Sequence, residues 1–237
     1  IIPTPKGEEE VYRLKFIQGG PLSTAELSLD EAKQEIIHFA EICRREVGFI
    51  RSAVSAKTKA EWESANEKLV KYENITDKIE YEIASYLNEV TKGDISAFSA
   101  LRIKSMYRVI GELESIGDSG EAIGRMMKRA LDHGKTFDEE MIKRLDRMLD
   151  LLDVAFGAMT ENLSSPALFL KDITNAEDAE YNINEYRNRL REEHIVNIEK
   201  DDYNYQTGVF YIDIVQELEK MGDFIINISQ SLLEKND

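Results

Sequence analysis

The sequence predicts an all-α protein built as two tandem antiparallel three-helix bundles, six long helices in all. Three observations support this fold class. Apolar residues recur at helical spacing in six runs. The composition is 42% hydrophobic and 32% charged, with only 4 Pro and 13 Gly among 237 residues, as long helices require. Sequence landmarks also repeat after little more than a hundred residues, which predicts an internal duplication.

The first half begins with a lead-in arm or linker over residues 1–27, where Pro and Gly prevent a long helix. Alternating residues at 11–17 suit a short extended arm laid on the body. The segment 28–31 has the pattern of a capping box, so we expect the first helix to begin at Ser28. The predicted first repeat covers 28–134, where Gly134 stops the third helix. Its helical runs are 28–54, 62–90 and 95–131.

The second half repeats this plan over 135–237. A second capping box at 136–139 lies 108 positions after the first. Helical spacing then continues, with a pause at Pro166, over 141–159, 170–195 and 205–233. The strongest internal match joins 112–118 to 217–223, 105 positions later, with five of seven residues identical. A weaker match joins 73–77 to 180–184, 107 positions later.

Pairs of acidic residues recur inside these matched segments. Glu114 and Asp118 stand at i and i+4 on one helix face, as do Glu219 and Asp223. Like charges at this spacing repel, so their repetition indicates that a cation or a basic partner offsets them. The second helix of each half adds a further pair, which could complete an oxygen-rich metal site. The candidate metal ligands are Glu73, Asp77, Glu114, Asp118, Glu180, Asn184, Glu219 and Asp223.

The second candidate site has one charge fewer because Asn184 replaces an acid, so we expect it to hold metal less tightly. Mid-helix Gly117 and Gly222 each cost about 1 kcal/mol against Ala, which close approach of a neighbouring helix or ligand would explain. The metal itself could be iron, zinc, manganese or magnesium. The competing interpretation is that these acids form a solvated helix face in an acid-rich chain.

The formal net charge of -16 argues against nucleic acid and anionic membrane surfaces as partners. It also disfavours direct binding of a free anion, so we expect any anion sensing to use a metal or a partner protein. The longest uncharged stretches are about ten residues, short of the roughly 20 needed to span a membrane. The chain opens without an initiator Met, and we expect another region to precede Ile1.

An enzymatic alternative is a carboxylate-bridged metal oxidase or hydrolase. Glu35 and His38 match the Glu-x-x-His pattern of di-iron bundles, but such sites need two copies and further Glu residues. We therefore expect no catalytic site and no cofactor-binding residues other than the metal candidates. A scaffold that retains these acidic motifs without using them is the third alternative.

At 112–118 and 217–223 the sequence resembles the PhoU family. The resemblance implies tandem three-helix bundles whose E-x-x-x-D motifs bind multinuclear metal clusters and which restrain phosphate uptake and signalling. The Asn that often follows the family's Asp is present as Asn227, whereas the first half has Ala122.

The lead-in at 14–27 is similar to the junction that joins bacterial Na/phosphate cotransporters to a C-terminal PhoU-like domain. This resemblance implies a regulatory domain at the cytoplasmic face of the inner membrane, membrane-associated through a sodium-dependent phosphate transporter in the same polypeptide. A homodimer is a further expectation. A free-standing PhoU-type phosphate-signalling regulator is the alternative.

Overall fold

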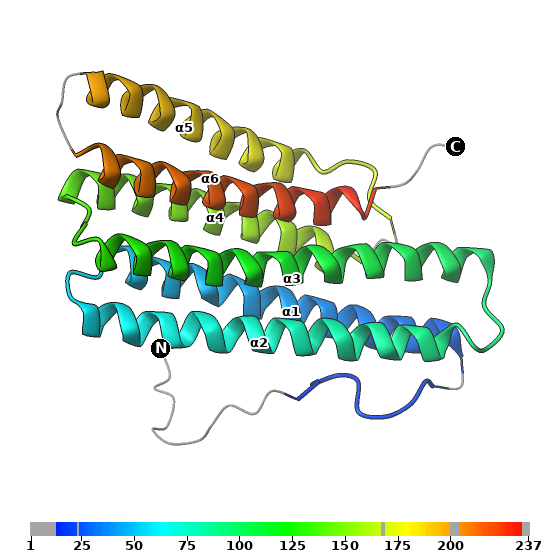
Figure 1. Cartoon of the computed structure of the whole chain (residues 1–237). Helices are drawn as coiled ribbons and strands as arrows, with labels where there is room; N and C mark the ends of the chain where they lie inside the picture. Colours follow the sequence, from blue (N-terminus) through cyan, green and yellow to red (C-terminus); the bar gives the residue numbers. More distant parts are fainter. Residues whose placement is uncertain (1–12, 23, 167–168, 200–203, 234–237) are drawn as a thin grey trace, which may run out of the picture.

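The computed structural model describes residues 13–22, 24–166, 169–199 and 204–233. Within these residues the predicted all-α class is confirmed, since helices dominate and the only extended pairing is an isolated bridge between Leu170 and Leu233. The six helices are shown in Figure 1 and are α1 (Ala25–Val54), α2 (Lys59–Val90), α3 (Ala97–Asp132), α4 (Glu139–Ser164), α5 (Thr174–Glu199) and α6 (Tyr205–Gln230).

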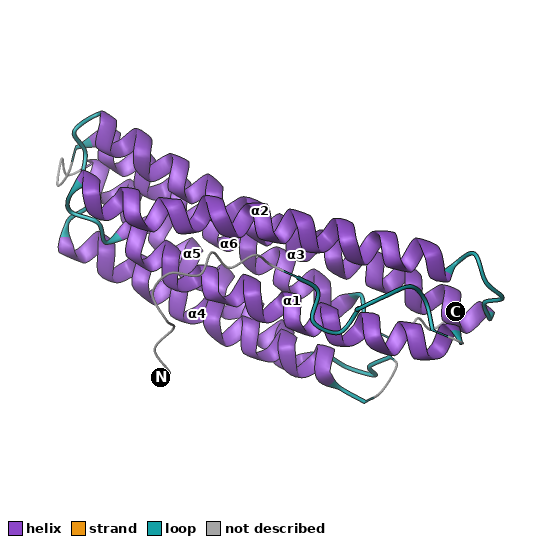
Figure 2. Ribbon diagram, turned by 90° about the horizontal axis from the view of Figure 1, so that it is seen from below, coloured by secondary structure: helices purple, strands orange, loops and turns teal. Residues whose placement is uncertain are grey.

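The helices form two three-helix bundles that lie side by side along their length (Figures 1 and 2). Helices α1, α2 and α3 pack on one another, and so do α4, α5 and α6. The bundles meet where α1 packs on α4 and α3 packs on α6, which leaves α2 and α5 on opposite outer sides. One apolar core runs through both bundles, because every helix turns a stripe of buried residues inward. Among the described helices, none is both long and apolar enough to cross a membrane.

The buried positions reveal the duplication more clearly than the motifs do. A shift of 109 positions places all ten buried residues of α4 on buried residues of α1. A shift of 105 positions does the same for α6 and α3 at every buried residue except Ile226. Each bundle therefore packs its first and third helices in the same register.

Glycines at equivalent positions bring the second and third helices of each bundle together. A Cβ at Gly117 would lie 2.3 Å from Thr76 Oγ1, and one at Gly222 would lie 3.1 Å from Ile183 Cδ1. Thr76 and Ile183 are themselves 107 positions apart. The expectation that these glycines mark close approach of a neighbouring helix is confirmed.

The predicted starts of α1 and α4 were wrong. Thr24 caps α1, its Oγ1 accepting the Leu27 N–H, and the helix begins one turn before Ser28. Ser28 is fully buried, and its Oγ instead accepts the N–H of Leu22 at 2.9 Å. Asp138, not Thr136, caps α4, because its carboxylate accepts the Met141 N–H at 2.8 Å. Other polar side chains, four residues before the predicted cap in α1 and two residues after it in α4, thus cap the helices.

The ends of α5 and α6 also differ from the predicted runs. Leu170 lies outside α5, and its N–H donates to the Leu232 carbonyl at 2.7 Å. Helix α6 ends at Gln230, three residues before the predicted end, and α5 is shifted four residues along the chain, from the predicted 170–195 to Thr174–Glu199. Gly134 adopts φ 68, the left-handed conformation that favours glycine, and the predicted stop after α3 is confirmed.

The lead-in is held on α1 by a buried carboxylate. Glu35 Oε2 accepts the backbone N–H groups of Lys15, Phe16 and Ile17 at 2.8, 2.6 and 3.3 Å. Residues 13–17 form no strand, while Val11 and Tyr12 of the predicted arm lie outside the described residues. Glu35 therefore anchors the lead-in, which explains the isolated Glu-x-x-His pattern without a di-iron site.

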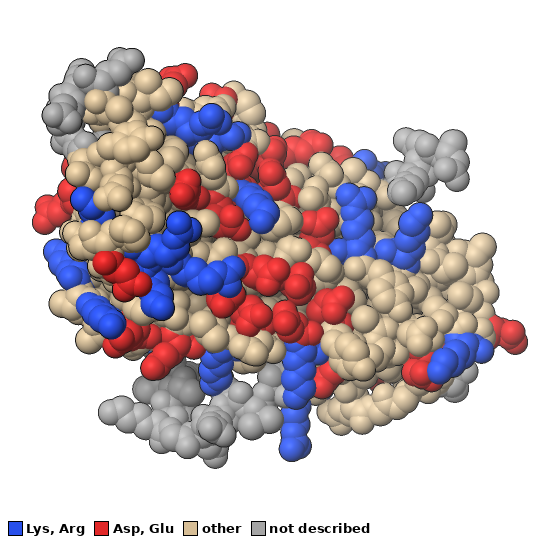
Figure 3. All heavy atoms as spheres, in the orientation of Figure 1, with Lys and Arg blue, Asp and Glu red and all other residues tan. Residues whose placement is uncertain are grey.

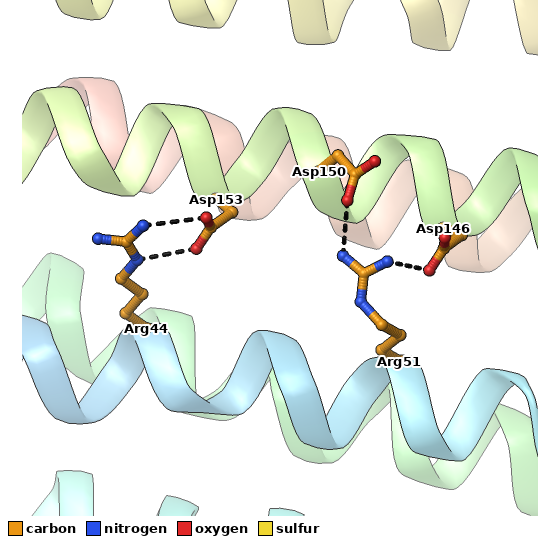
Figure 4. A network of polar contacts seen from close by, with 5 residues as sticks. All are labelled: Arg44, Arg51, Asp146, Asp150 and Asp153. Atoms are coloured by element: carbon orange, nitrogen blue, oxygen red, sulfur yellow. Dashed lines mark hydrogen bonds and ion pairs between the residues drawn. The ribbon is translucent and has the colours of Figure 1, made fainter. Parts of the chain in front are cut away.

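The two bundles are joined by polar contacts between antiparallel helices. Figure 4 shows Arg44 of α1 donating two parallel hydrogen bonds to Asp153 of α4, at 2.8 and 2.9 Å. Arg51 of α1 contacts Asp150 and Asp146, which lie about one and two turns before Asp153 on α4. These pairs are solvent-exposed, so they fix the orientation of the bundles more than they add stability.

The contact between α3 and α6 is also polar at matched positions. Asn227 Nδ2 donates to Glu112 Oε2 at 3.2 Å, and Ser119 Oγ donates to Glu217 Oε1 at 2.6 Å. Glu112 and Glu217 are equivalent residues of the two repeats, 105 positions apart. Asn227 thus bridges the two bundles, and Ala122 at the equivalent position of α3 has no amide with which to do so.

Candidate metal centre

Three acidic side chains of the first bundle converge where α2 and α3 are closest. Glu73 and Asp77 lie one turn apart on α2, and Asp118 follows Gly117 on α3. Because Gly117 has no side chain, α3 packs directly against Thr76, which lies between the two acids of α2. The glycine therefore sets the short distance at which the three carboxylates meet. Figure 3 shows acidic side chains gathered over α2 and α3 near the middle of the molecule.

The geometry of this group suits one hard cation. Glu73, Asp77 and Asp118 each offer a carboxylate oxygen, and the three oxygens lie within 4.8 Å of one another. Ligand oxygens on opposite sides of a Mg²⁺ or Ca²⁺ ion are about 4 to 5 Å apart. Glu73 is half-buried, whereas Asp77 and Asp118 are exposed. The group is thus open to solvent on one side and can exchange an ion with it.

Among the described residues that act on Glu73, three acids face one basic side chain, Arg125. Burial raises the pKa of Glu73, and the nearby Asp77, Glu121 and Asp118 raise it further, while Arg125 lowers it. Arg125 is itself paired with Glu121 at the edge of the cluster. A positive ion bound among the acids would relieve this repulsion.

Two more acids extend the cluster. Burial raises the pKa of Glu114, and Asp118, Asp77 and Glu80 raise it further, which places this side chain beside the group although outside its tightest part. Ser115 Oγ donates to Glu114 at 3.3 Å. The four acids predicted for the first half therefore share one patch, to which Glu80 also contributes.

Sequence reasoning missed a further carboxylate on the inner side, Glu46 of α1. Its side chain is 1% exposed, and neither carboxylate oxygen has a hydrogen-bond partner among the described residues. Burial raises the pKa of Glu46 well above its usual range, and Glu73 and Asp118 raise it further. An acid within the apolar stripe between Cys43 and Ile50 was the available signal.

The second bundle brings its predicted residues together differently. Glu219 Oε1 forms an ion pair with Arg187 Nη2 at a distance of 2.9 Å, and both side chains are largely buried. Asn184 Nδ2 donates to Glu180 Oε1 at 2.5 Å. Burial raises the pKa of Asp223, while Arg187 lowers it.

Arg187 thus provides a positive charge within this second patch. Among the residues that the structure describes, no second group of three acids meets the spacing of the first. The metal-ligand roles of all eight predicted residues stay predictions.

No protein-family model and no curated protein matches the sequence. Solved structures match the fold over most of its length, and two of them are PhoU proteins. One is the phosphate transport system regulatory protein PhoU from Streptococcus pneumoniae, with a TM-score of 0.68 and 17% identity, covering 88% of this chain and 95% of that one. The other is PhoU from Pseudomonas aeruginosa, with a TM-score of 0.67 and 14% identity, covering 87% and 96%.

The chain has the PhoU fold. The match covers nearly the whole of each PhoU chain, so it includes both three-helix bundles and their packing on each other. The predicted tandem architecture is thereby confirmed. In this PhoU fold the acidic group of the first bundle lies on α2 and α3, the helices that carry the E-x-x-x-D segments.

Proposed function

We propose that this chain is a PhoU-like regulator of phosphate transport and is not an enzyme. The observation that carries the proposal is the match, over 88% of this chain, to a PhoU described as a phosphate transport system regulatory protein. The solvent-open acidic group supports it, because a surface site that lacks a deep substrate pocket suits regulation by ion or partner binding.

In this proposal the chain acts on a membrane transporter through protein contacts. Residues 1–27 connect it to a preceding membrane region, and the two repeats occupy 28–134 and 135–237, with α1 beginning slightly earlier at Ala25. The transporter is sodium-dependent and belongs to the same polypeptide, which places the bundle at the cytoplasmic face of the inner membrane. Glu35 supports this connection, because it fixes the direction in which the lead-in leaves α1. A free-standing PhoU regulator with a homodimeric assembly is the alternative.

A metal ion forms part of the proposal. The donor set of the first bundle is all carboxylate oxygen, which fits a hard ion such as Mg²⁺ or Mn²⁺ best and also accepts iron. Glu73, Asp77 and Asp118 would hold the ion, with Glu114 nearby. The bound ion would supply positive charge on a strongly acidic surface, to which a phosphate group or an acidic partner segment can bind.

Phosphate uptake in the source organism tests the proposal. The coding region for residues 25–237 is deleted, and uptake of radiolabelled phosphate is measured after growth in low and in high phosphate. We expect the deletion to leave uptake high in phosphate-rich medium, and the intact gene to restore its restraint. Unchanged uptake under both conditions would contradict the proposed function. Sequencing the gene upstream of Ile1 separates the transporter domain from the free-standing regulator, since only the former predicts membrane spans there.

A further inference from the structure

Glu46 is a carboxylate that the fold buries without compensation. It lies on α1 at 1% exposure, with both oxygens unpartnered within the described part of the chain. The charged groups that raise its pKa, Glu73 and Asp118, are also acids and belong to the candidate metal centre. An unpaired buried acid must either hold a proton or meet a cation, and the acids beside Glu46 would attract a cation from outside the chain.

Helix α3 leaves space for this carboxylate. An ideal Cβ at Gly120 would lie 2.6 Å from Glu46 Oε2, so a residue larger than glycine would displace the acid. Gly120 is fully buried and lies two residues after Asp118. Glu46 therefore lies against α3 in the protein interior, near the acidic group but outside its three oxygens that lie within 4.8 Å of one another, whereas Asp77 and Asp118 are on the solvent side.

The second bundle lacks this arrangement because two matched positions carry other residues. At the register of 109 that aligns α4 with α1, Ala155 takes the place of Glu46. At the register of 105 that aligns α6 with α3, Ile225 takes the place of Gly120. Where the first bundle has a large acid against a glycine, the matched positions of the second carry an alanine and a large apolar residue, a pair of similar combined volume with no carboxylate.

A third difference gives the second bundle positive charge at positions where the first bundle has none. At the register of 107 that aligns α5 with α2, Arg187 takes the place of Glu80 and Arg191 that of Ala84. Arg187 forms its ion pair with Glu219, the equivalent of Glu114. The guanidinium group therefore supplies the second patch with a positive charge that the first patch lacks at the matched position.

We propose that the exchangeable cation site lies in the first bundle, with Glu46 as its inner ligand beside Glu73, Asp77 and Asp118, and that Arg187 replaces the cation in the second bundle. The ligand is a hard divalent ion, because every donor in the group is a carboxylate oxygen. This inference rests on the metal binding included in the proposed function, but not on the role in phosphate transport.

Calorimetric titration of the metal-free chain with Mn²⁺ tests the inference. We expect one high-affinity ion per chain. Glu46→Gln should weaken binding at least about tenfold, while Glu41→Gln on the exposed side of α1 should not. Asp118→Asn should abolish binding, whereas the matched Asp223→Asn should leave the affinity within about twofold. Circular dichroism and the melting temperature without metal establish that each variant is folded.

A glycine pair provides an independent readout. Gly120→Ala should weaken Mn²⁺ binding by displacing the Glu46 carboxylate, while Gly111→Ala, with open space around its Cβ, should not. Equal binding by wild type and folded Glu46→Gln would overturn the inference and leave metal binding itself intact. Loss of binding in Asp223→Asn equal to that in Asp118→Asn would overturn the asymmetry. If the wild type binds no Mn²⁺ at millimolar concentration, both this inference and the proposed metal binding are wrong, while uptake assays still decide the regulatory function.

Discussion

Arg187 Nη2 lies 2.9 Å from Glu219 Oε1, and the residue equivalent to Arg187 in the first bundle is Glu80. The two bundles thus share one backbone plan but balance their acids differently. We predict that Arg187→Met lowers the free energy of unfolding by about 1 to 3 kcal/mol, because it leaves a largely buried carboxylate unpaired. Arg189→Met, which removes a mainly exposed pair with Glu193, should cost no more than about 0.5 kcal/mol. Urea denaturation measures both, and equal losses would contradict the prediction.

Two glycines of α3 should respond oppositely to alanine. Gly111 has open space around its Cβ position, so Gly111→Ala should stabilise the protein by about 1 kcal/mol through helix propensity. At Gly117 a Cβ would lie 2.3 Å from Thr76 Oγ1, so Gly117→Ala should destabilise by about 1 to 3 kcal/mol. Thermal melts of both variants check the signs. A stabilising Gly117→Ala would show that α2 and α3 are not in close contact.

Removing the Glu35 carboxylate should release the lead-in from α1. Glu35→Ala leaves three backbone N–H groups without their acceptor, at a cost on the order of 1 to 3 kcal/mol. Hydrogen exchange at Lys15, Phe16 and Ile17 should accelerate strongly. Glu41→Ala, on the exposed side of the same helix, is the matched control and should leave these amides protected. Unchanged exchange in Glu35→Ala would refute the anchoring role.

The metal-free protein should lose stability as the pH rises through the range in which its clustered acids ionise. Burial and neighbouring acids raise the folded-state pKa values of Glu46, Glu73 and Glu114. Between the ordinary Glu pKa of about 4.3 and these raised values, the folded state holds protons that the unfolded state has released. The free energy of unfolding therefore falls as the pH rises through this range.

Glu46→Gln isolates this effect from that of other acids. The variant should show a shallower fall in the free energy of unfolding between about pH 4.3 and neutrality than the wild type, because it has no proton to lose at position 46. Chemical denaturation at a series of pH values, with a chelator present, measures the difference. Parallel curves for the two proteins would contradict the burial of an ionisable group at this site.

Much of the fold could be predicted because long amphipathic helices leave a strong periodic signal. Helix ends were less predictable, since they depend on tertiary contacts. Ser28 lost its capping role when its hydroxyl was used to hold Leu22, and the α5 start moved because Leu170 pairs with the end of α6. Neither contact leaves a local sequence pattern.

The candidate site was predictable in outline for similar reasons. Spacing alone placed Glu114 and Asp118 on one face, and the duplication pointed to Glu73 and Asp77. Glu46 was missed because its role depends on a third helix and on the space left by Gly120. Arg187 was missed because the sequence comparison aligned matching residues, whereas this position differs in charge between the repeats.

The central claim is that the first bundle holds the cation site and the second does not. The location of a bound ion tests this claim most directly. Crystals of the chain soaked in Mn²⁺ and measured near the manganese absorption edge will show the ion by anomalous scattering. We predict a peak among the carboxylates of Glu73, Asp77 and Asp118, with Glu46 on its inner side. A peak of equal height beside Glu219 and Asp223, or no peak in the first bundle, would contradict the claim.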